Sequence, residues 1–388
     1  MTLRGCEVLI IGGGVAGLAA AAALIQRGAR VQICEASADF GQVGAGLQIS
    51  PNGARVIDAL GGRGGLTKIA MRSAAVRLRD GRTGRPVLDL DLTDAGPGFH
   101  LIHRADLIDL LVGLADGARI RLGTSVTAVD LLSTHPSVTL ATGEKLTADL
   151  ILGADGLHSR VRPALQPREM SPGFTGQVAW RALIPTGSTQ PDAVAEVFMG
   201  PGRHLVSYPL RDGELRNLVA VEERSAWAQE GWRHPDDPAN LRAAFTRFSD
   251  PVRAWLDQVD EVWLWGLFRH PVAERWHGAA AALLGDAAHP TLPFMAQGAN
   301  LALEDAWVLA REVERGTDLT QGLAAYQARR RVRVAKVVEV ANRNARNYHL
   351  RPPLAQIAHA LLRVGGRLRP DAALRRFDWI YGHDVTAA

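Results

Sequence analysis

The feature that most constrains the fold is a glycine-rich turn near the start of the chain. The turn, Gly12 to Gly17, reads G-x-G-x-x-G. It follows an apolar run typical of a buried parallel strand, Val8 to Ile11, and precedes an Ala-rich helical pattern, Leu18 to Arg27. In such a unit Gly12 permits the tight turn, Gly14 lets the backbone approach a pyrophosphate, and Gly17 lets the helix pack on the strand. The pattern predicts a dinucleotide-binding parallel sheet.

An acidic residue stands where the ribose of a dinucleotide would be recognised. Val31 to Cys34 reads as the second strand, and Glu35 lies at its end. A carboxylate there accepts hydrogen bonds from ribose hydroxyls and disfavours a 2′-phosphate. The helix that follows the turn offers free N–H groups to the phosphates. The turn and the acid do not separate FAD from NAD.

The remaining patterns predict an α/β fold with an inserted sheet. A loop that leads into a helix is expected over Gly41 to Gly53, and a helix over Arg104 to Leu114. Alternating, Trp- and Pro-rich segments between Pro172 and His270 predict a mixed β-sheet domain inserted into a doubly wound parallel sheet, with C-terminal helices after it. The predicted domains are a discontinuous nucleotide-binding domain (1–71, 100–171 and 273–350), an inserted sheet domain (72–99 and 172–272) and a C-terminal helical segment (351–388).

Composition narrows the class of protein. The 388 residues are 47% hydrophobic and 22% charged, which is typical of a globular enzyme, and the net charge of +4 is mild. We expect no nucleic-acid or membrane partner, and a monomer or homodimer. The basic run Arg329 to Arg333 is interpreted as a solvated or salt-bridged helix face. The two cysteines, Cys6 and Cys34, are expected to be buried thiols of a cytoplasmic protein, with no metal site.

Two later segments carry a resemblance to a known family. Asp149 to Arg162 reads DLILGADGLHSRVR, and Gly285 to Asn300 reads GDAAHPTLPFMAQGAN. Together with the N-terminal turn, they resemble the three fingerprints of the single-component (class A) FAD-dependent aromatic hydroxylases. HRADL at His103 and YPLR at Tyr208 resemble most the salicylate, 3-hydroxybenzoate and 6-hydroxynicotinate hydroxylases.

The resemblance implies an activity and its cofactors. The expected reaction is hydroxylation of a phenolic or N-heteroaromatic carboxylic acid by O2 through a C4a-hydroperoxyflavin, with FAD as cofactor and NADH or NADPH as transient reductant. No second dinucleotide fingerprint is present, so the choice between NADH and NADPH stays open. The expected cofactor-binding residues are Gly12, Gly14, Val15, Ala16, Gly17, Glu35, Ala36, Arg104, Val126, Asp155, Asp286, Pro293, Gly298, Ala299 and Asn300.

The third fingerprint also makes physical sense on its own. Asp286 comes just after a buried strand, at the sheet edge where ligands of α/β folds bind, and could accept hydrogen bonds from a ribityl chain. Gln297 to Asn300 opens a long helix whose N–H groups could stabilise negative charge on a reduced flavin. The alternative is that Asp286 only caps a turn. Likewise, Asp155 and Arg162 either serve the cofactors or form an Asp-Gly turn and its salt-bridge partner.

Two residues on one predicted strand are the catalytic candidates. His204 and Tyr208 lie four residues apart, so both face the same side of a sheet. His204 could act as a base or proton relay toward a phenol, and Tyr208 could hydrogen-bond the substrate; the alternative is that both only shape the pocket. The expected substrate-binding residues are Gln48, Trp180, Arg181 and Phe294. Phe294 and Pro293 depart from a histidine and a glutamine in relatives, which suggests a more apolar pocket.

Two other functions remain open at this point. One is hydroxylation of a quinone precursor or polycyclic natural product on the same fold. The other is a flavin-binding redox or regulatory protein without hydroxylase turnover. NADH oxidation that rises when a phenol is added would exclude the second.

Overall fold

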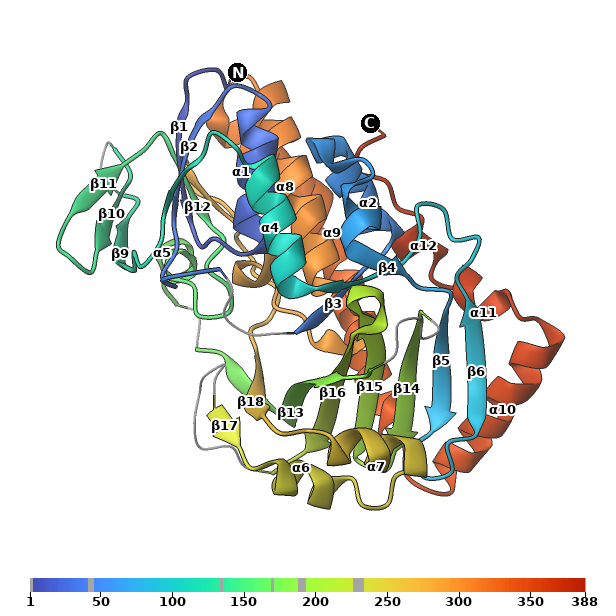
Figure 1. The fold of residues 1–388 in the computed structure, drawn as a ribbon. Helices are drawn as coiled ribbons and strands as arrows, with labels where there is room; N and C mark the ends of the chain where they lie inside the picture. Colours follow the sequence, from blue (N-terminus) through green and yellow to red (C-terminus); the bar gives the residue numbers. More distant parts are fainter. Residues whose placement is uncertain are drawn as a thin grey trace.

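The computed structural model describes residues 3–40, 45–132, 135–168, 171–187, 193–225 and 234–387. Two sheets dominate it, with long helices beside the first and shorter helices on the outside of the second (Figure 1). The expected α/β fold with a doubly wound parallel sheet, a mixed sheet and C-terminal helices is confirmed.

The first sheet is parallel and has the predicted glycine-rich turn at its centre. Its strand order is β19-β12-β1-β2-β8. Because β1 lies between β2 and β12, the turn after β1 stands at the carboxyl edge beside the ends of both neighbours. The strands are β1 (Glu7–Ile11), β2 (Arg30–Cys34), β8 (Arg119–Arg121), β12 (Leu150–Gly153) and β19 (Ala281–Leu283).

Helices cover one side of this sheet and a small antiparallel sheet lies on the other (Figure 1). Helix α1 packs against α4 and α8, and α8 packs against α9. Its Ala-rich residues 19–23 are fully buried, because small side chains let the helix lie between the sheet and α8. The elements are α1 (Val15–Ile25), α4 (Arg104–Leu114), α8 (Gly298–Arg315), α9 (Leu319–Tyr348), α5 (Val161–Leu165), β9 (Val126–Asp130), β10 (Ser137–Leu140) and β11 (Lys145–Thr147).

The second sheet is mixed and has the order β17-β18-β13-β16-β15-β14-β5-β6. Only β14 and β5 pair in parallel among its pairs, and the two strands come from the two segments expected to form the inserted domain. The strands are β5 (Ala75–Asp80), β6 (Pro86–Asp91), β13 (Gly173–Pro185), β14 (Val194–Gly200), β15 (Arg203–Leu210), β16 (Leu215–Glu223), β17 (His234–Asp236) and β18 (Val262–Arg269).

One face of this second sheet is covered by helices that come from the same part of the chain. Phe245 and Phe248, beside α6 (Pro238–Ala244), and Val252 and Leu256 of α7 (Asp250–Asp257) pack on Trp180 and its neighbours. Helix α10 (Leu354–Leu368) lies along the edge strand β6, where Arg363 donates to the carbonyl of Pro86 at 2.9 Å. Short helices α11 (Ala372–Arg375) and α12 (Asp378–Tyr381) follow.

A third group of short elements joins the two sheets. The strands β3 (Gly46–Ile49), β7 (His100–His103) and β4 (Ala70–Arg72) form a small antiparallel sheet, with α2 (Pro51–Ile57) and α3 (Gly65–Ile69) beside it. The predicted loop over Gly41 to Gly53 was therefore wrong in part, because β3 lies inside it, whereas the helix it was expected to lead into is α2, which begins at Pro51. The local sequence gives only a weak strand signal, and β3 forms because it pairs with β7. Residues 41–44 of that loop lie outside the described residues.

The predicted helix Arg104 to Leu114 is confirmed with the same bounds. The described part of the chain contains no helix that is both long and apolar enough to cross a membrane.

Candidate functional site

Of the three motif glycines in the turn, Gly14 alone has room beside it among the described residues. Gly12 has φ +101°, and a Cβ there would lie 2.4 Å from the carbonyl oxygen of Ala154. A Cβ on Gly17 would lie 1.9 Å from the carbonyl oxygen of Gly12. Gly14, in contrast, has an extended backbone, and no described atom lies within 4 Å of its Cβ position. Gly12 and Gly17 are therefore required by the protein's own packing, whereas Gly14 borders open space in front of the helix. This fits the close approach of a pyrophosphate.

Glu35 is held in place at the end of β2. The backbone N–H of Gly13 donates to its Oε2 at 2.6 Å, and that of Ser37 donates to its Oε1 at 2.8 Å. The carboxylate therefore joins the turn to the second strand. Since a carboxylate has about four lone-pair positions, it still has capacity for ribose hydroxyls.

Two acidic residues meet at the carboxyl edge of β12 and β19. These strands are paired, with Gly153 opposite Leu283, so Asp155 and Asp286 follow neighbouring strands. Asp155 Oδ2 accepts from the N–H of Arg160 at 2.6 Å, while its buried Oδ1 has no hydrogen-bond partner within the described residues. Burial raises the pKa of Asp286 and likewise that of Asp155. Asp155 Oδ1 thus remains available to accept a hydrogen bond, which fits a polyhydroxylated ligand such as the ribityl chain.

Arg162 connects the second and third fingerprints. Its Nη1 donates to the carbonyls of Ala287 and Ala288 at 2.9 and 3.2 Å, and its Nη2 donates to that of Pro271 at 2.8 Å. The residue is 2% exposed. Arg162 therefore fixes the 3-10 turn that carries Asp286, which is a structural task.

The start of α8 has no side-chain cap among the described residues. Ala296 has a left-handed conformation with φ 51°, which turns the chain into the helix, and no side chain caps the first turn. Such a terminus carries free N–H groups and the positive end of the helix dipole. It can therefore hold an anionic or carbonyl edge of a ligand.

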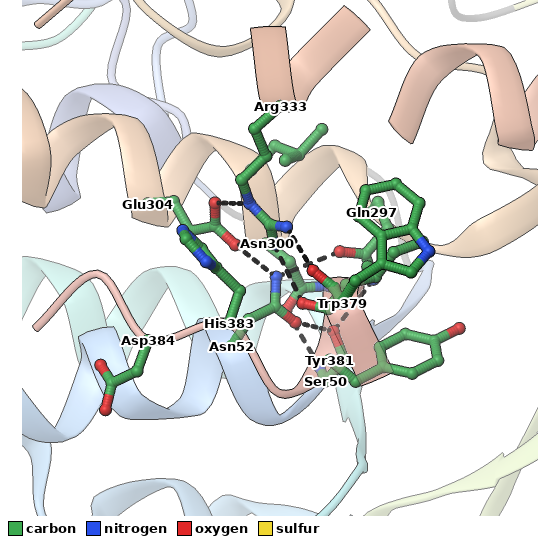
Figure 2. A network of polar contacts seen from close by, with 12 residues as sticks. Ser50, Asn52, Gln297, Asn300, Glu304, Arg333, Trp379, Tyr381, His383 and Asp384 are labelled. Atoms are coloured by element: carbon green, nitrogen blue, oxygen red, sulfur yellow. Dashed lines mark hydrogen bonds and ion pairs between the residues drawn. The ribbon is translucent and has the colours of Figure 1, made fainter. Parts of the chain in front are cut away.

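The side chain of Asn300 is used by the protein itself (Figure 2). Its Oδ1 accepts from the N–H of Ser50 at 3.0 Å, and its Nδ2 donates to the carbonyls of Gln48 and Ala296 at 3.0 and 2.7 Å. Gln297 donates to Ser50 Oγ at 3.0 Å. Any contribution of Asn300 to a cofactor must therefore come from its backbone, while its side chain fixes β3 against α8.

A buried ionic network supports this arrangement from behind. Asn52 Nδ2 donates to Glu304 Oε1 at 2.6 Å, and Arg333 donates to both oxygens of Glu304 at 2.8 and 2.9 Å. Burial alone would raise the pKa of Glu304, but Arg330 and Arg333 outweigh it and hold that pKa at about 2. Figure 2 shows that the network also reaches the C-terminal segment, where Arg333 binds the carbonyl of Trp379 at 2.7 Å.

This network also revises the interpretation of the basic run. Arg330 is 1% exposed and pairs with Glu304 and Asp305, and Arg329 pairs with Glu312 at 3.0 Å. The run is salt-bridged, as expected, but part of it is buried between α8 and α9 and is not a solvated face.

The catalytic candidates face the parallel-sheet part of the molecule from β15. Every second residue of β15 points to the same face of the mixed sheet, so His204, Val206 and Tyr208 share one face. Directly opposite residues share a face, so Val219 and Arg181 join that face through the register Val206↔Val219↔Arg181. Arg181 therefore lies two strands away from β15, level with the midpoint between His204 and Tyr208.

The expectation for Trp180 was wrong. It lies opposite Ala220 and Leu205 on the other face of the sheet, is fully buried against Phe245, and donates to Asp236 Oδ2 at 2.7 Å. Neighbouring strand residues point to opposite faces, so Trp180 and Arg181 cannot both face the site.

Buried hydrogen-bond donors without partners gather around Tyr208. Arg181 stacks on Trp265, with its Cζ 4.4 Å from the ring centroid, and its Nε has no partner within the described residues. Asn217, opposite Tyr208, accepts from the N–H of Gly46 at 2.8 Å, while its Nδ2 is buried and unpaired there too. Burial lowers the pKa of Arg181 to about 10, so it remains a cation at neutral pH.

His204 lies in an aromatic environment next to the third fingerprint. Its ring centroid is 5.3 Å from that of Phe294 and 5.2 Å from that of Tyr348, and the residue is 1% exposed. Burial, followed by the nearby His349, holds the pKa of His204 well below its usual value. The imidazole is therefore neutral near pH 7, which is the form that can accept a proton.

Several contributors were not found from the sequence. Asn217, Asn52, His349 and Glu223 gave no local signal, because each acquires its role only through contacts with distant elements. The described residues contain no group of three or more His, Cys, Asp or Glu side chains that could hold a metal ion.

Comparison with known proteins gives consistent matches along almost the whole chain. Residues 5–341 match the family model described as an FAD binding domain. The chain is 34% identical to 3-amino-4-hydroxybenzoate 2-monooxygenase of Streptomyces cremeus, over 90% of this chain and 89% of that protein. It is 31% identical to salicylate hydroxylase of Pseudomonas putida, over 98% and 93%. The structure of Klebsiella pneumoniae HpxO complexed with FAD and uric acid superposes with a TM-score of 0.82 at 25% identity, covering 94% of each chain.

Proposed function

The chain belongs to the family of FAD-dependent aromatic hydroxylases, and from this premise we propose that its substrate is a phenolic or N-heteroaromatic carboxylic acid. The bound FAD supplies electrons from NADH or NADPH and activates O2 for transfer of one oxygen atom to the ring. The names of relatives that act on salicylate and on an aminohydroxybenzoate support this substrate class.

The observation that carries the proposal is the buried, unpaired pair of donors beside Tyr208. A buried cation without an acidic partner is costly, and so is a buried amide N–H without an acceptor. Arg181 Nε and Asn217 Nδ2 are such groups within the described residues. An aromatic carboxylate satisfies both through charge-assisted hydrogen bonds. We therefore assign Arg181 to the substrate carboxylate, with Asn217 beside it.

The same face holds the groups that act on the ring. With the carboxylate at Arg181, the hydroxyl of the substrate reaches either Tyr208 or His204. Burial raises the pKa of Tyr208, so its hydroxyl stays a donor. Neutral His204 accepts the phenol proton, which makes the ring more electron-rich. Phe294, whose ring packs against that of His204, would limit the access of water, and Gln48 is kept as a proposed substrate contact.

The proposed cofactor site follows the geometry of the parallel sheet. Gly14 admits the pyrophosphate, Glu35 binds the ribose, Asp155 and Asp286 bind ribityl hydroxyls, and the start of α8 binds the pyrimidine edge of the flavin. The further proposed contacts are Gly12, Val15, Ala16, Gly17, Ala36, Arg104, Val126, Pro293, Gly298, Ala299 and the backbone of Asn300.

Replacing Asp286 tests the ribityl contact. Asp286→Ala should weaken FAD binding by about 1.5–3 kcal/mol, which is about 10- to 150-fold in Kd, because charge-assisted hydrogen bonds are lost. Fluorescence titration of the apoprotein with FAD measures this. The exposed Asp260→Ala is the control and should bind FAD like the parent protein. Unchanged affinity in folded Asp286→Ala protein would remove this residue from the site.

Replacing Arg181 tests the substrate class. Arg181→Gln should weaken binding of an aromatic acid by about 10- to 150-fold, since a charged hydrogen bond is worth about 1.5–3 kcal/mol. Binding of the matching neutral amide, measured on the same FAD-loaded proteins, should change by less than about threefold. Equal losses for acid and amide, or no loss for the acid, would contradict a carboxylate site at Arg181.

We also propose the domain boundaries, the oligomeric state and the cellular location of the protein. The two sheets give two domains with boundaries near residues 72, 100, 172 and 273, and a C-terminal helical segment begins at residue 351. The protein acts as a monomer or homodimer, which light scattering measures. We place it in the cytoplasm, where Cys6 and Cys34, both free and buried, remain thiols.

A further inference from the structure

A chain of three hydrogen-bonded side chains leads from the candidate active site to the protein surface. His204 Nδ1 lies 2.7 Å from His349 Nε2, and His349 Nδ1 lies 3.0 Å from Glu223 Oε1. His349 directly follows α9, and Glu223 is the last residue of β16. The side chain of Glu223 is 42% exposed, whereas the two imidazoles are buried. These three side chains, called the relay below, thus connect a buried base with solvent.

The direction of these hydrogen bonds determines where each proton lies. An ionised carboxylate only accepts, so His349 must donate from Nδ1 to Glu223. A neutral imidazole has one N–H, so His349 Nε2 is then an acceptor, and His204 must donate to it from Nδ1. His204 Nε2 consequently carries a lone pair. Within the described residues, the hydrogen bond of His204 is made through Nδ1, which leaves Nε2 for a substrate.

We propose that His349 and Glu223 are positioning residues that hold His204 in the base-competent tautomer and pass the proton it accepts to solvent. This rests on the proposed function, in which His204 takes the proton of a bound phenol. Neither residue touches the ring; both act through His204.

The proton transfer balances without any further reactant. The O–H bond of the phenol breaks, its electron pair stays on oxygen, and the proton forms an N–H bond at His204 Nε2. His204 then releases its Nδ1 proton to His349 Nε2, and His349 releases its Nδ1 proton to Glu223. Glu223 gives one proton to water, so one proton has left the substrate and one has reached solvent.

The surroundings of the relay disfavour a long-lived imidazolium at His349 or His204. Burial lowers the pKa of His349, and Arg203 nearby lowers it further, against the opposing effect of Glu223. Tyr348 faces His204, and burial raises its pKa to about 12, so it stays uncharged. Arg351 lies 3.5 Å from Glu223 Oε2 at the surface end. Phe294 and the strand partner Met199 add no charge. Transfer through neutral histidines is therefore favoured over storage of the proton.

The first test reads the tautomers directly. Nitrogen-15 NMR of the imidazoles in FAD-loaded protein should show His204 and His349 protonated at Nδ1 and unprotonated at Nε2, with assignments from His204→Gln and His349→Gln. Glu223→Gln should mix the tautomers, because an amide can donate as well as accept. Glu222→Gln is the matched control: it is the adjacent carboxylate but pairs with Arg203 and Arg224 on the opposite face, so its spectrum should match the parent.

The second test is kinetic and uses a hydroxybenzoate that stimulates NAD(P)H oxidation. His349→Gln and Glu223→Gln should lower kcat for hydroxylation by about 10- to 100-fold. This loss is smaller than the one expected when the general base itself is removed. KM and FAD occupancy should stay within about threefold of the parent. The rate of Glu223→Gln should also rise with pH more steeply than that of the parent, since proton release then depends on hydroxide.

The outcomes separate this inference from the proposed function. Parental rates and pH profiles in both variants, with His204→Gln still slow, would overturn the relay and leave the proposed function intact. A parent spectrum that shows His204 protonated at Nε2 would likewise overturn the relay without contradicting the proposed function. The expected tautomers and their dependence on Glu223, found in a protein that turns over no phenolic acid, would support the positioning role and contradict the proposed function.

Discussion

Gly14→Val protein is expected to fold normally and to be purified without FAD. The backbone of Gly14 is extended, a conformation that valine favours, and no described atom lies within 4 Å of the Cβ position. The side chain would therefore fill only the space in which we place the pyrophosphate. We expect the Kd for FAD to rise at least about 100-fold, which corresponds to about 2.7 kcal/mol. Flavin absorbance per chain and thermal unfolding of the apoprotein measure the two effects.

A second glycine provides the control for this substitution. A Cβ on Gly113 in α4 also meets no described atom within 4 Å, but Gly113 lies on an exposed part of that helix. Gly113→Ala should bind FAD like the parent protein. Full FAD occupancy in Gly14→Val would show that the pyrophosphate does not approach this turn. Gly12 and Gly17 cannot give so clear a result, because substitutions there collide with the protein's own backbone.

His204→Gln should have the largest effect on the chemical step. Glutamine can keep a polar contact with His349 but cannot act as a base near neutral pH. Loss of a general base costs about 10²–10⁴-fold in the proton-dependent step. FAD binding should be unchanged, because His204 lies on β15 and not in the three fingerprint segments. A larger share of the NAD(P)H consumed should yield hydrogen peroxide, since the ring is less activated. Product and peroxide formed per NAD(P)H measure this.

The control is a histidine far from the mixed sheet. His277→Gln, next to β19, should match the parent in rate and coupling. Should His204→Gln also match the parent with the true substrate, the residue only shapes the pocket and the base must be sought elsewhere. Tyr208→Phe should retain most of the rate and lose affinity modestly, since it removes a single hydrogen bond of about 1 kcal/mol.

The sequence predicted the parallel sheet well for physical reasons. Its strands β1, β12 and β19 are short, buried apolar runs, and the G-x-G-x-x-G turn restricts what can follow β1. The edge strand β8, which reads Arg-Ile-Arg, carries no such signal. The positions of Gly14 after β1 and of Glu35 after β2 could be predicted from the sequence, because they depend on local spacing alone. The loop over 41–53 was harder, because β3 exists only through its pairing with β7, about fifty residues later.

The substrate face was only partly predictable. The spacing of four between His204 and Tyr208 placed both on one face, but the paired register of three strands was needed to bring Arg181 there and to remove Trp180. Asn217 and the two residues of the relay became visible only through contacts between β15, β16 and the end of α9. No period or motif in one sequence encodes such contacts.

The central claim is that this chain transfers one atom of O2 to an aromatic acid. The most direct measurement is turnover of a panel of hydroxylated benzoates and pyridine carboxylates by FAD-loaded protein with NADH or NADPH under ¹⁸O2, with mass analysis of the products. We predict that at least one acid stimulates NAD(P)H oxidation and gives a hydroxylated product that carries one ¹⁸O atom. NAD(P)H oxidation that no acid of the panel stimulates, or products without ¹⁸O, would contradict the account.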